Sequence, residues 1–500
     1  MKKTFLLSCL MLAAMPVMAA YTGHVYVDKN KNGVFDQSEK PLAGIKVSDG
    51  LNVVETAADG SFTLPGHERE RFIFITTPSG YKTFNRHYHK IEKKQSGYDF
   101  GLIPYSGRIR KDGSHRYIHI TDTEIFNTEN HADWVNNVHD YARNEQAAFI
   151  IHTGDICYEK GLKAHIKLMN TENMDCPVFY CIGNHDLVKG KYGEELFESI
   201  YGPVYYSFDA GNVHYVVTPM PGGDHAPGYT SDDVCRWLKN DLAHIRPGTP
   251  VVVFNHDLLT YEDTFIFKSK NAGSINLNEY NLKAWVYGHW HINYMKKQGD
   301  VYSVCTSSLD KGGIDHSTTA FRVMHVDSKG DFTSELRYTY LDKNICIASP
   351  AGVMASGVLP VAVNVYSSVS PVREVLYTCL ADGKPVLKNK RLLQSTDWSW
   401  NGELPLSHKY LGKELTLRVT ARFNNGEIAE AESHFICRTE KAVPLFSADW
   451  DNLSGNAKHS APVSAPLNLP LQLAWTNNVG ANLYMTSPLI HKGKVIVASV

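Results

Sequence analysis

The amino-acid sequence predicts an α/β domain flanked by all-β domains. Between residues 110 and 345, short apolar runs alternate with amphipathic segments such as 132–146, which is the pattern of strands connected by helices. On both sides of this region, strand-like runs are separated by Gly, Pro, Asn and Asp turns. We therefore expect a β module over 21–105, an α/β domain over 110–345 and a β sandwich over 350–440.

Composition limits the kinds of function that the chain can have. Of its 500 residues, 43% are apolar and 20% are charged, so each domain can bury a core. The formal net charge is −2 and there is no basic tail, which argues against nucleic acid as the main partner. The nine cysteines form no Cys-x-x-Cys pair, so a cysteine zinc site is not expected. Cys379 and Cys437 both lie in the later β region. They are expected either to form a disulfide or to be two buried free thiols.

The first 20 residues predict a secretory signal peptide. Lys2 and Lys3 form a positive start, an apolar core follows over 5–17, and Ala19 and Ala20 suit cleavage. The apolar run is shorter than the roughly 20 residues of a membrane-spanning helix, although a retained N-terminal anchor is the alternative. We expect a secreted protein, periplasmic or at the cell surface, with no membrane span in the mature chain.

One segment of the β module has the spacing of an EF-hand calcium loop. Oxygen-bearing side chains recur at loop positions 1, 3, 5, 9 and 12, with Gly33 at position 6 and a backbone carbonyl at position 7. The predicted ligands are Asp28, Asn30, Asn32, Val34, Asp36 and Glu39. Because no long helix precedes the loop, we expect a structural calcium on a β scaffold. A polar hairpin without metal is the alternative. The module itself resembles the prealbumin-like sandwiches of secreted proteins.

The C-terminal part predicts further β structure. The strand-like runs of 350–440 favour a seven-strand immunoglobulin-like sandwich. A linker rich in Pro, Ala and Ser follows over 445–470, and 471–500 resembles the start of a blade in a β-propeller. Since a propeller needs several blades, we expect the chain to continue, with a simple β tail as the alternative.

Five short segments of the α/β region end an apolar run in metal-binding or acid–base residues. They are Asp122-Thr-Glu124, Gly154-Asp-Ile-Cys-Tyr158, Gly183-Asn-His-Asp186, Asn255-His256-Asp257 and Gly288-His-Trp-His291. Parallel strands present their carboxyl ends at one edge of a sheet, so we expect these segments to meet. Carboxylates and imidazoles can hold two metals that activate water and neutralise phosphoryl oxygens. The segments therefore predict a metal-dependent phosphoester hydrolase.

The order and spacing of these segments resemble the calcineurin-like metallophosphoesterase superfamily, over about residues 110–310. The resemblance implies a four-layer α/β/β/α sandwich and two metals that activate a hydroxide. It implies that the metals are bound by Asp122, Asp155, Asn184, His256, His289 and His291. Asp155 bridges both metals in this scheme. Asp122 and His291 bind the first metal, and the other three bind the second. The resemblance also implies that His185 is the general acid and phosphate contact, helped by its neighbour Asp186.

The sequence departs from the superfamily pattern at Glu124, where members often have histidine. Glutamate can bind a metal through oxygen and favours Mn²⁺ or Fe, whereas Zn²⁺ also suits the imidazoles. Tyr158 resembles the tyrosine of the purple acid phosphatases, which binds Fe(III), and those enzymes have glycine in place of Glu124. Either Glu124 or Tyr158 is therefore expected to complete the first metal site, with Glu124 preferred.

The predicted function is hydrolysis of a phosphoester substrate, as a phosphomonoesterase or a phosphodiesterase, with cell-envelope components as further partners. The alternative is a non-catalytic envelope or glycan-binding protein with a degenerate phosphoesterase domain. Residues 220–229 form a polar and aromatic stretch, which is either a substrate loop or a plain surface loop.

Overall fold

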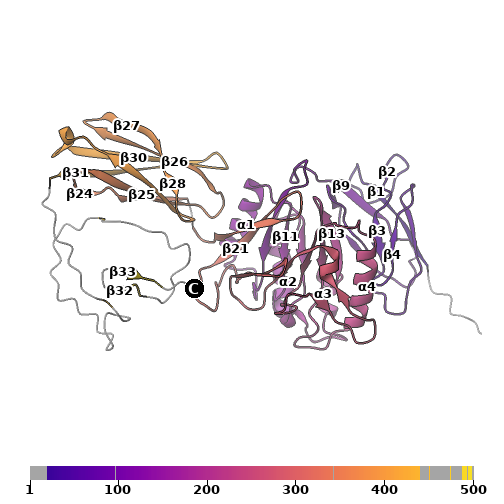
Figure 1. Ribbon diagram of the computed structural model, residues 1–500. Helices are drawn as coiled ribbons and strands as arrows, with labels where there is room; N and C mark the ends of the chain where they lie inside the picture. The colour runs from indigo at the N-terminus through magenta and orange to yellow at the C-terminus, as the bar shows by residue number, and fades with distance from the viewer. Residues whose placement is uncertain are drawn as a thin grey trace, which may run out of the picture.

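Three folded parts follow one another along the chain in the computed structural model (Figure 1). It describes residues 20–95, 97–341 and 343–439, together with 450, 473, 487–491 and 494–497. The predicted signal peptide therefore lies outside the described residues, as do most of the linker and of the predicted propeller start. From that last region the structure describes a hairpin of β32 (Leu489–His491) and β33 (Lys494–Ile496). None of the described helices is both long enough and apolar enough to span a membrane.

The N-terminal β module contains two sheets around a small apolar core. The first sheet comprises β1 (Tyr21–Val27), β2 (Lys40–Pro41), β5 (Ser61–Leu64), β7 (Tyr81–Thr83) and β9 (Phe100–Pro104). The second comprises β3 (Lys46–Ser48), β4 (Val53–Glu55), β6 (Phe72–Ile75) and β8 (Tyr88–Lys90). Buried residues such as Val25, Val47 and Ile73 form the core. Alternation of apolar and polar residues over strands this short is enough to bury one face of each sheet.

The α/β domain is built on two mixed sheets. In the first sheet the order is β12 (Val178–Tyr180), β11 (Phe149–His152), β10 (His115–Ile120), β21 (Ala320–Val326) and β22 (Phe332–Tyr338). In the second it is β13 (Tyr206–Ala210), β14 (Val213–Val217), β15 (Val251–Phe254), β18 (Leu282–Tyr287), β20 (Val301–Cys305) and β19 (Tyr294–Gln298). Strands β10, β11 and β12 run parallel, as do β14, β15, β18 and β20. The final strands β21 and β22 are antiparallel.

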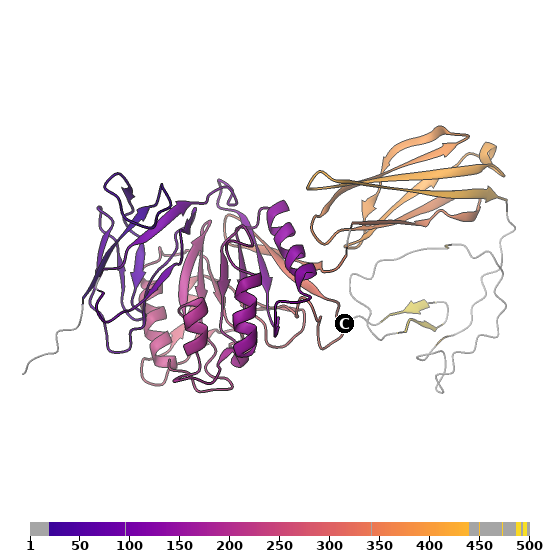
Figure 2. The same cartoon turned by 180° about the vertical axis from the view of Figure 1, so that it is seen from behind.

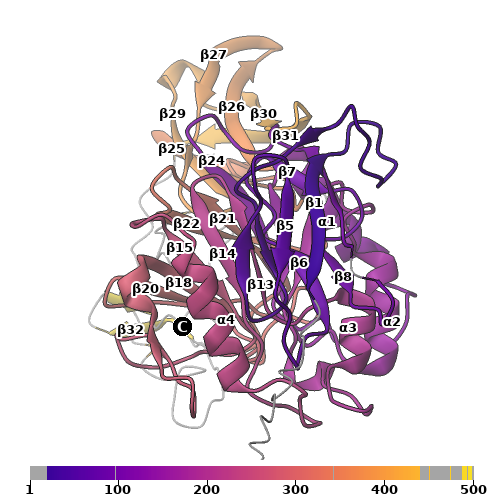
Figure 3. The same cartoon turned by 90° about the vertical axis from the view of Figure 1, so that its right-hand side faces the viewer.

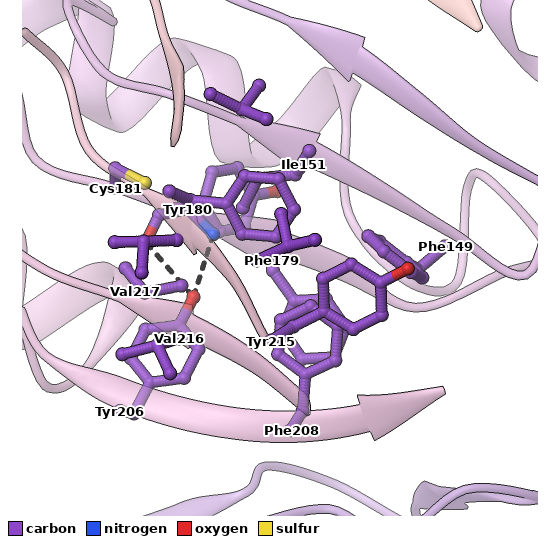
Figure 4. Packing of buried hydrophobic residues seen from close by; sticks show 14 of the residues in the cluster. Phe149, Ile151, Phe179, Tyr180, Cys181, Tyr206, Phe208, Tyr215, Val216 and Val217 are labelled. Carbon is purple, nitrogen blue, oxygen red and sulfur yellow. Dashed lines mark hydrogen bonds between the residues drawn. The ribbon is translucent and has the colours of Figure 1, made fainter. Parts of the chain in front are cut away.

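Aromatic side chains join the two sheets. Phe149 of the first sheet lies 4.9 Å from both Phe208 and Tyr215 of the second, between ring centroids (Figure 4). Tyr117 packs edge-on against Phe254 at 5.7 Å. All five rings are buried. Interlocked rings leave little freedom for one sheet to slide on the other, so the relative position of the two sets of strand ends is well defined.

The helices of the α/β domain pack on the sheets from outside. They are α1 (Ala132–Asn144), α2 (Tyr158–Leu168), α3 (Glu195–Tyr201) and α4 (Ser231–Ala243). Tyr141 of α1 packs on Phe321 of the first sheet at 5.4 Å, and Asp241 of α4 hydrogen-bonds Ser207 of the second. The amphipathic segments that predict helices at α1 and α4 are confirmed.

The N-terminal module shares the outer side of the second sheet with α4 (Figures 2 and 3). The ring centroids of Trp237 in α4 and Phe74 in the module are 6.3 Å apart. The backbone N–H of Asp209 in β13 donates to the carbonyl of Thr77 in the module at 2.8 Å. The predicted α/β domain between β domains is therefore found. The exact four-layer α/β/β/α order stays a prediction.

The C-terminal sandwich has nine strands among the described residues, where the sequence favours seven. One sheet contains β23 (Asn344–Ser349), β25 (Val358–Tyr366), β28 (Leu393–Gln394) and β29 (Ser399–Pro405). The other contains β24 (Gly352–Ala355), β26 (Val372–Ala381), β27 (Lys384–Arg391), β30 (Glu414–Phe423) and β31 (Ile428–Arg438). Cys379 and Cys437 are buried free thiols, because β30 separates their strands in one sheet.

Candidate metal centre

The five predicted segments meet at the carboxyl ends of five strands. Asp122 and Glu124 follow β10, and Asp155 follows β11. Asn184, His185 and Asp186 form the short 3-10 helix η1 (Asn184–Asp186) after β12. His256 follows β15, and His289 and His291 follow β18. Three segments thus come from the first sheet and two from the second, so packing of the sheets brings them together.

Donor atoms from both sheets lie within a few ångströms of one another. His256 Nε2 is 3.1 Å from Asp155 Oδ2 and 3.9 Å from Asp122 Oδ1. His291 Nε2 is 3.2 Å from Asp122 Oδ1. One ligand atom each from Asp155, His256 and His289 all lie within 4.8 Å of one another. The sequence places these residues up to 169 positions apart, and the fold gathers them into one cluster.

Three buried atoms of this cluster make no well-formed hydrogen bond, namely Asp122 Oδ1, Asn184 Oδ1 and His256 Nε2. Two of them are in ion-pair contacts only: His256 Nε2 with Asp155 at 3.1 Å and Asp122 Oδ1 with His291 at 3.2 Å. Buried polar atoms nearly always find a partner, because an unpaired one loses its hydration without compensation. A carboxylate oxygen, an amide oxygen and an imidazole nitrogen share one chemical ability, which is to bind a cation. The residues present therefore fit a divalent metal.

The other polar atoms of the same side chains are held by neighbours. His256 Nδ1 lies 2.7 Å from the carbonyl of Thr153, so Nε2 is the nitrogen that faces the carboxylates of the cluster. Asp122 Oδ2 accepts hydrogen bonds from Thr121 Oγ1 at 2.7 Å and from the backbone N–H of His289 at 3.0 Å. Bonds of this kind fix the orientation of a metal ligand and raise its affinity.

The backbone of the cluster is strained. Among the described residues, sixteen non-glycine residues have positive φ, and seven of them belong to these loops, namely Asp122, Glu124, Asp155, Cys157, Tyr158, His289 and His291. Side chains other than glycine rarely adopt this conformation, and such residues concentrate at functional sites. The intrinsic backbone preferences of these residues therefore do not favour the loop conformation, and contacts with the rest of the fold must hold it.

Two motif glycines are needed because the loops approach so closely. A Cβ atom on Gly183 would lie 2.2 Å from Asp155 Oδ1. A Cβ atom on Gly288 would lie 1.9 Å from Thr121 Oγ1 and 2.6 Å from Asp122 Oδ2. Any side chain at either position would displace a carboxylate of the cluster.

The charges of the cluster perturb its titration. Burial lowers the pKa of His256, but the Asp155 and Asp122 carboxylates outweigh burial and raise that pKa to about 9. Burial raises the pKa of Asp155, and the His256 ring more than offsets this, so the pKa of Asp155 is lowered. Without metal, the imidazole thus carries the positive charge that the buried carboxylates require.

His185 forms a pair with a residue that the sequence did not single out. Its Nδ1 lies 2.8 Å from Asp224 Oδ2, and its backbone N–H donates to Asp155 Oδ1 at 3.0 Å. Burial lowers the pKa of His185, but the Asp224 hydrogen bond and the nearby carboxylates raise it overall. Asp224 lies in the 220–229 stretch, and its backbone N–H donates to the carbonyl of Asn184 at 3.0 Å. The Gly-Gly-Asp turn there was the only sequence signal.

Asp186 takes a different place from the predicted one beside the acid. Its carboxylate is fully buried and accepts hydrogen bonds from the backbone N–H groups of Cys157 and Gly183, both at 2.9 Å. Burial and the Asp155 charge raise its pKa to about 7. Asp186 therefore ties two loops together, whereas Asp224 contacts the His185 ring.

Glu124 and Tyr158 point to different neighbours. Glu124 Oε1 lies 3.6 Å from His291 Nε2, and Lys311 Nζ donates to Glu124 Oε2 at 2.8 Å. The Tyr158 hydroxyl lies 3.5 Å from His185 Nδ1, and 43% of the residue is exposed. Glu124 is thus beside His291, and Tyr158 is beside His185.

Cys157 is a further neighbour that the sequence did not predict, within 4.8 Å of Glu124 and Asp155 ligand atoms. Burial and four nearby carboxylates raise the pKa of its thiol far above the usual range. Since the thiolate is the metal-binding form, this cysteine is a weak ligand candidate.

The predicted calcium loop curls around its own polar side chains. Buried Asp28 accepts hydrogen bonds from the N–H groups of Asn32 at 3.2 Å and Gly33 at 2.9 Å. Asp36 Oδ2 accepts from the side-chain amides of Asn30 at 2.7 Å and Asn32 at 3.1 Å. Glu39 is buried and accepts from the N–H of Asp36 at 3.2 Å, and Val34 is exposed. Calcium at this loop stays a prediction.

Comparison with known proteins identifies relatives of both regions. Residues 115–293 match the family model for calcineurin-like phosphoesterase, and residues 29–104 match the model for the N terminal of calcineurin-like phosphoesterase. Purple acid phosphatase 13 of Arabidopsis thaliana is 26% identical over 215 residues, which are 40% of this chain and 36% of that protein. The chain thus spans about a third of the length of this relative.

Two solved structures resemble parts of the chain at low identity. An archaeal phosphodiesterase is 13% identical and covers 44% of this chain and 99% of its own, with a TM-score of 0.24. Vacuolar protein sorting 29 of Cryptosporidium parvum is 10% identical and covers 59% of this chain and 99% of its own, also with a TM-score of 0.24. The two family-model matches together span just over half of the chain and contain every donor of the cluster, so the chain belongs to the calcineurin-like phosphoesterase family.

Proposed function

We propose that the protein is a metal-dependent phosphoester hydrolase, acting as a phosphomonoesterase or a phosphodiesterase. The observation that carries this proposal is the cluster of buried carboxylate, amide and imidazole atoms at the strand ends, three of which make no well-formed hydrogen bond. Membership of the calcineurin-like phosphoesterase family supports the same reaction class. The family relationship gives the class of reaction, and the donor cluster gives the place where it would occur.

The proposed metal ligands divide between two positions that share Asp155. Asp122, Glu124 and His291 would hold the first metal, because Asp122 and Glu124 oxygens both lie within 3.6 Å of His291 Nε2. Asn184, His256 and His289 would hold the second. Mixed carboxylate and imidazole donors suit Mn²⁺, Fe or Zn²⁺. Two such ions would neutralise phosphoryl oxygens and supply an activated water.

His185 is proposed as the general acid. It is one-third exposed, so a substrate can reach its ring, and its backbone N–H ties it to Asp155. In this proposal the Asp224 carboxylate accepts a hydrogen bond from His185 Nδ1–H. This contact orients Nε2 so that it can donate a proton to the leaving oxygen. Asp224 is therefore a positioning residue in this proposal.

The alternative is a non-catalytic envelope or glycan-binding protein. The intact cluster of carboxylates, imidazoles and His185 weighs against it, because a binding protein has no need for unpaired buried donors. We also propose export to the periplasm or cell surface, which rests on the pattern of residues 1–20, and a structural calcium at the 28–39 loop.

Replacing His185 and Asp155 should separate acid catalysis from metal binding. We expect His185→Ala to lose about 10²- to 10⁴-fold in turnover of phosphate mono- or diesters while keeping its metals. Asp155→Asn should lose metal and turnover together. Metal content by mass spectrometry and product release would be measured on the same samples, with His434→Ala of the C-terminal sandwich as control. No turnover and no bound metal in the unaltered protein would contradict the proposal.

Replacing Glu124 and Tyr158 should decide which completes the first metal site. Glu124→Ala should weaken binding of one of the two metals by at least tenfold, because an oxygen donor is lost beside His291. Tyr158→Phe should leave both affinities unchanged. Stepwise metal titration followed by calorimetry measures this. A visible tyrosinate–iron band that disappears in Tyr158→Phe would show the opposite assignment.

Calcium should stabilise the β module through the 28–39 loop. A ligand that binds only the folded state at 100 times its Kd adds about 2.7 kcal/mol to the free energy of unfolding. We expect millimolar calcium to raise the Tm of the unaltered chain and not that of Asp28→Ala, with turnover the same in both. Asp59→Ala, an exposed aspartate of the same module, serves as control. Equal calcium responses in all three proteins would rule out this site.

A further inference from the structure

A cavity of about 630 Å³ is lined in part by residues of loops that also carry members of the metal cluster. Its walls come from the loop 219–221, the segment 255–260 after β15, the start of α4 and the short strand β16 (Ile266–Phe267), with Trp285 of β18 at its base. The volume is in the range of sites that hold small organic molecules.

Two walls of this cavity continue into the metal cluster. Asn255 and Asp257 line the cavity on either side of His256 in the sequence. The 219–221 wall leads directly into Asp224, which bonds the His185 ring and the carbonyl of Asn184. Asp257 also accepts a hydrogen bond at 3.1 Å from Trp290 Nε1, between His289 and His291 in the chain. The loops that line the cavity are therefore the loops that carry His256 and Asp224.

The walls of the cavity are mainly apolar. Met220, Leu258, Leu259, Phe267 and Trp285 all contribute. Their side chains carry no charge. Binding of an apolar ligand is favourable here because it removes apolar surface of both the ligand and the cavity from water.

The polar wall groups are already engaged with the protein. The Asn255 amide donates to Thr218 and Pro219 carbonyls at 3.1 Å, and Trp285 Nε1 donates to the carbonyl of Asp257 at 2.8 Å. Lys268 is the single basic side chain among the lining residues, and the carboxylates of Asp257 and Glu262 outnumber it. A second phosphate or another polyanion would find no cluster of positive charge here.

We propose that this cavity binds the organic group of the phosphoester substrate, and that this group is apolar. The proposal rests on the proposed phosphoesterase function and adds the substrate class to it. The cavity selects substrates by the apolar surface that they bury, while the cluster acts on the phosphoryl group common to all of them.

Substrates of increasing chain length test this proposal. We expect kcat/KM for n-alkyl p-nitrophenyl phosphates, or for n-alkyl phosphate monoesters, to rise roughly fourfold per added methylene group from methyl until the cavity is filled. Binding of n-alkylphosphonates, followed by calorimetry on the metal-loaded protein, should show the same increase without any turnover.

Ile266→Asp should remove this dependence and leave methyl esters unaffected. Ile266 lines the cavity and is 37% exposed, so the change does not disturb the core. Ile428→Asp is the matched control, because Ile428 is 46% exposed on the distant sandwich. Hydrolysis with no chain-length dependence would overturn the cavity proposal and leave the phosphoesterase proposal standing. Phosphonate binding that depends on chain length, without hydrolysis of any ester, would overturn the phosphoesterase proposal and leave an apolar binding cavity standing.

Discussion

Mutual repulsion among buried carboxylates at the strand ends is the constraint on which the site depends. Asp122 and Asp155 are almost completely buried, and Glu124 lies beside them. Burying like charges together is costly unless a positive charge compensates them. In the metal-free protein His256 partly fills that role, with a pKa raised to about 9. Its Nε2 and two cluster oxygens nevertheless make no well-formed hydrogen bond, as expected for groups arranged to hold cations.

Rigid packing is what keeps this unfavourable arrangement in place. The rings between the two sheets fix the strand ends, and Gly183 and Gly288 let the loops approach to within contact of the carboxylates. The N-terminal module contributes as well. Arg71 binds Glu194 at 2.8 Å, and Arg69 donates to the carbonyl of Gly228 at 2.7 Å, near the end of the loop that carries Asp224. The module is thus part of the support of the acid's partner.

The sequence predicted which residues follow each strand, because the strand pattern and the motif are both local. Each of the five segments directly follows its strand in the structure. Metal binding by these residues stays a prediction. Asp224 was not predicted as a partner of His185 because the two are 39 residues apart and meet only through tertiary packing. The place of Asp186 was also missed, since its sequence neighbour is His185 but its bonds go to Cys157 and Gly183.

The same limit explains the difference in the C-terminal sandwich. Strands such as β28, with two residues, are too short to show alternation, so seven strands were expected where the structure has nine. Cys379 and Cys437 share a sheet, but only the strand order shows that β30 lies between them. Pairing order is a property of the whole domain and not of either strand.

Anomalous diffraction from crystals soaked in Mn²⁺ or Zn²⁺ would show where metals bind in the cluster. We expect two anomalous peaks about 3.5–4 Å apart, both in contact with Asp155, with one beside His291 and the other beside His256. A single peak, or no peak between these side chains at saturating metal, would contradict this expectation.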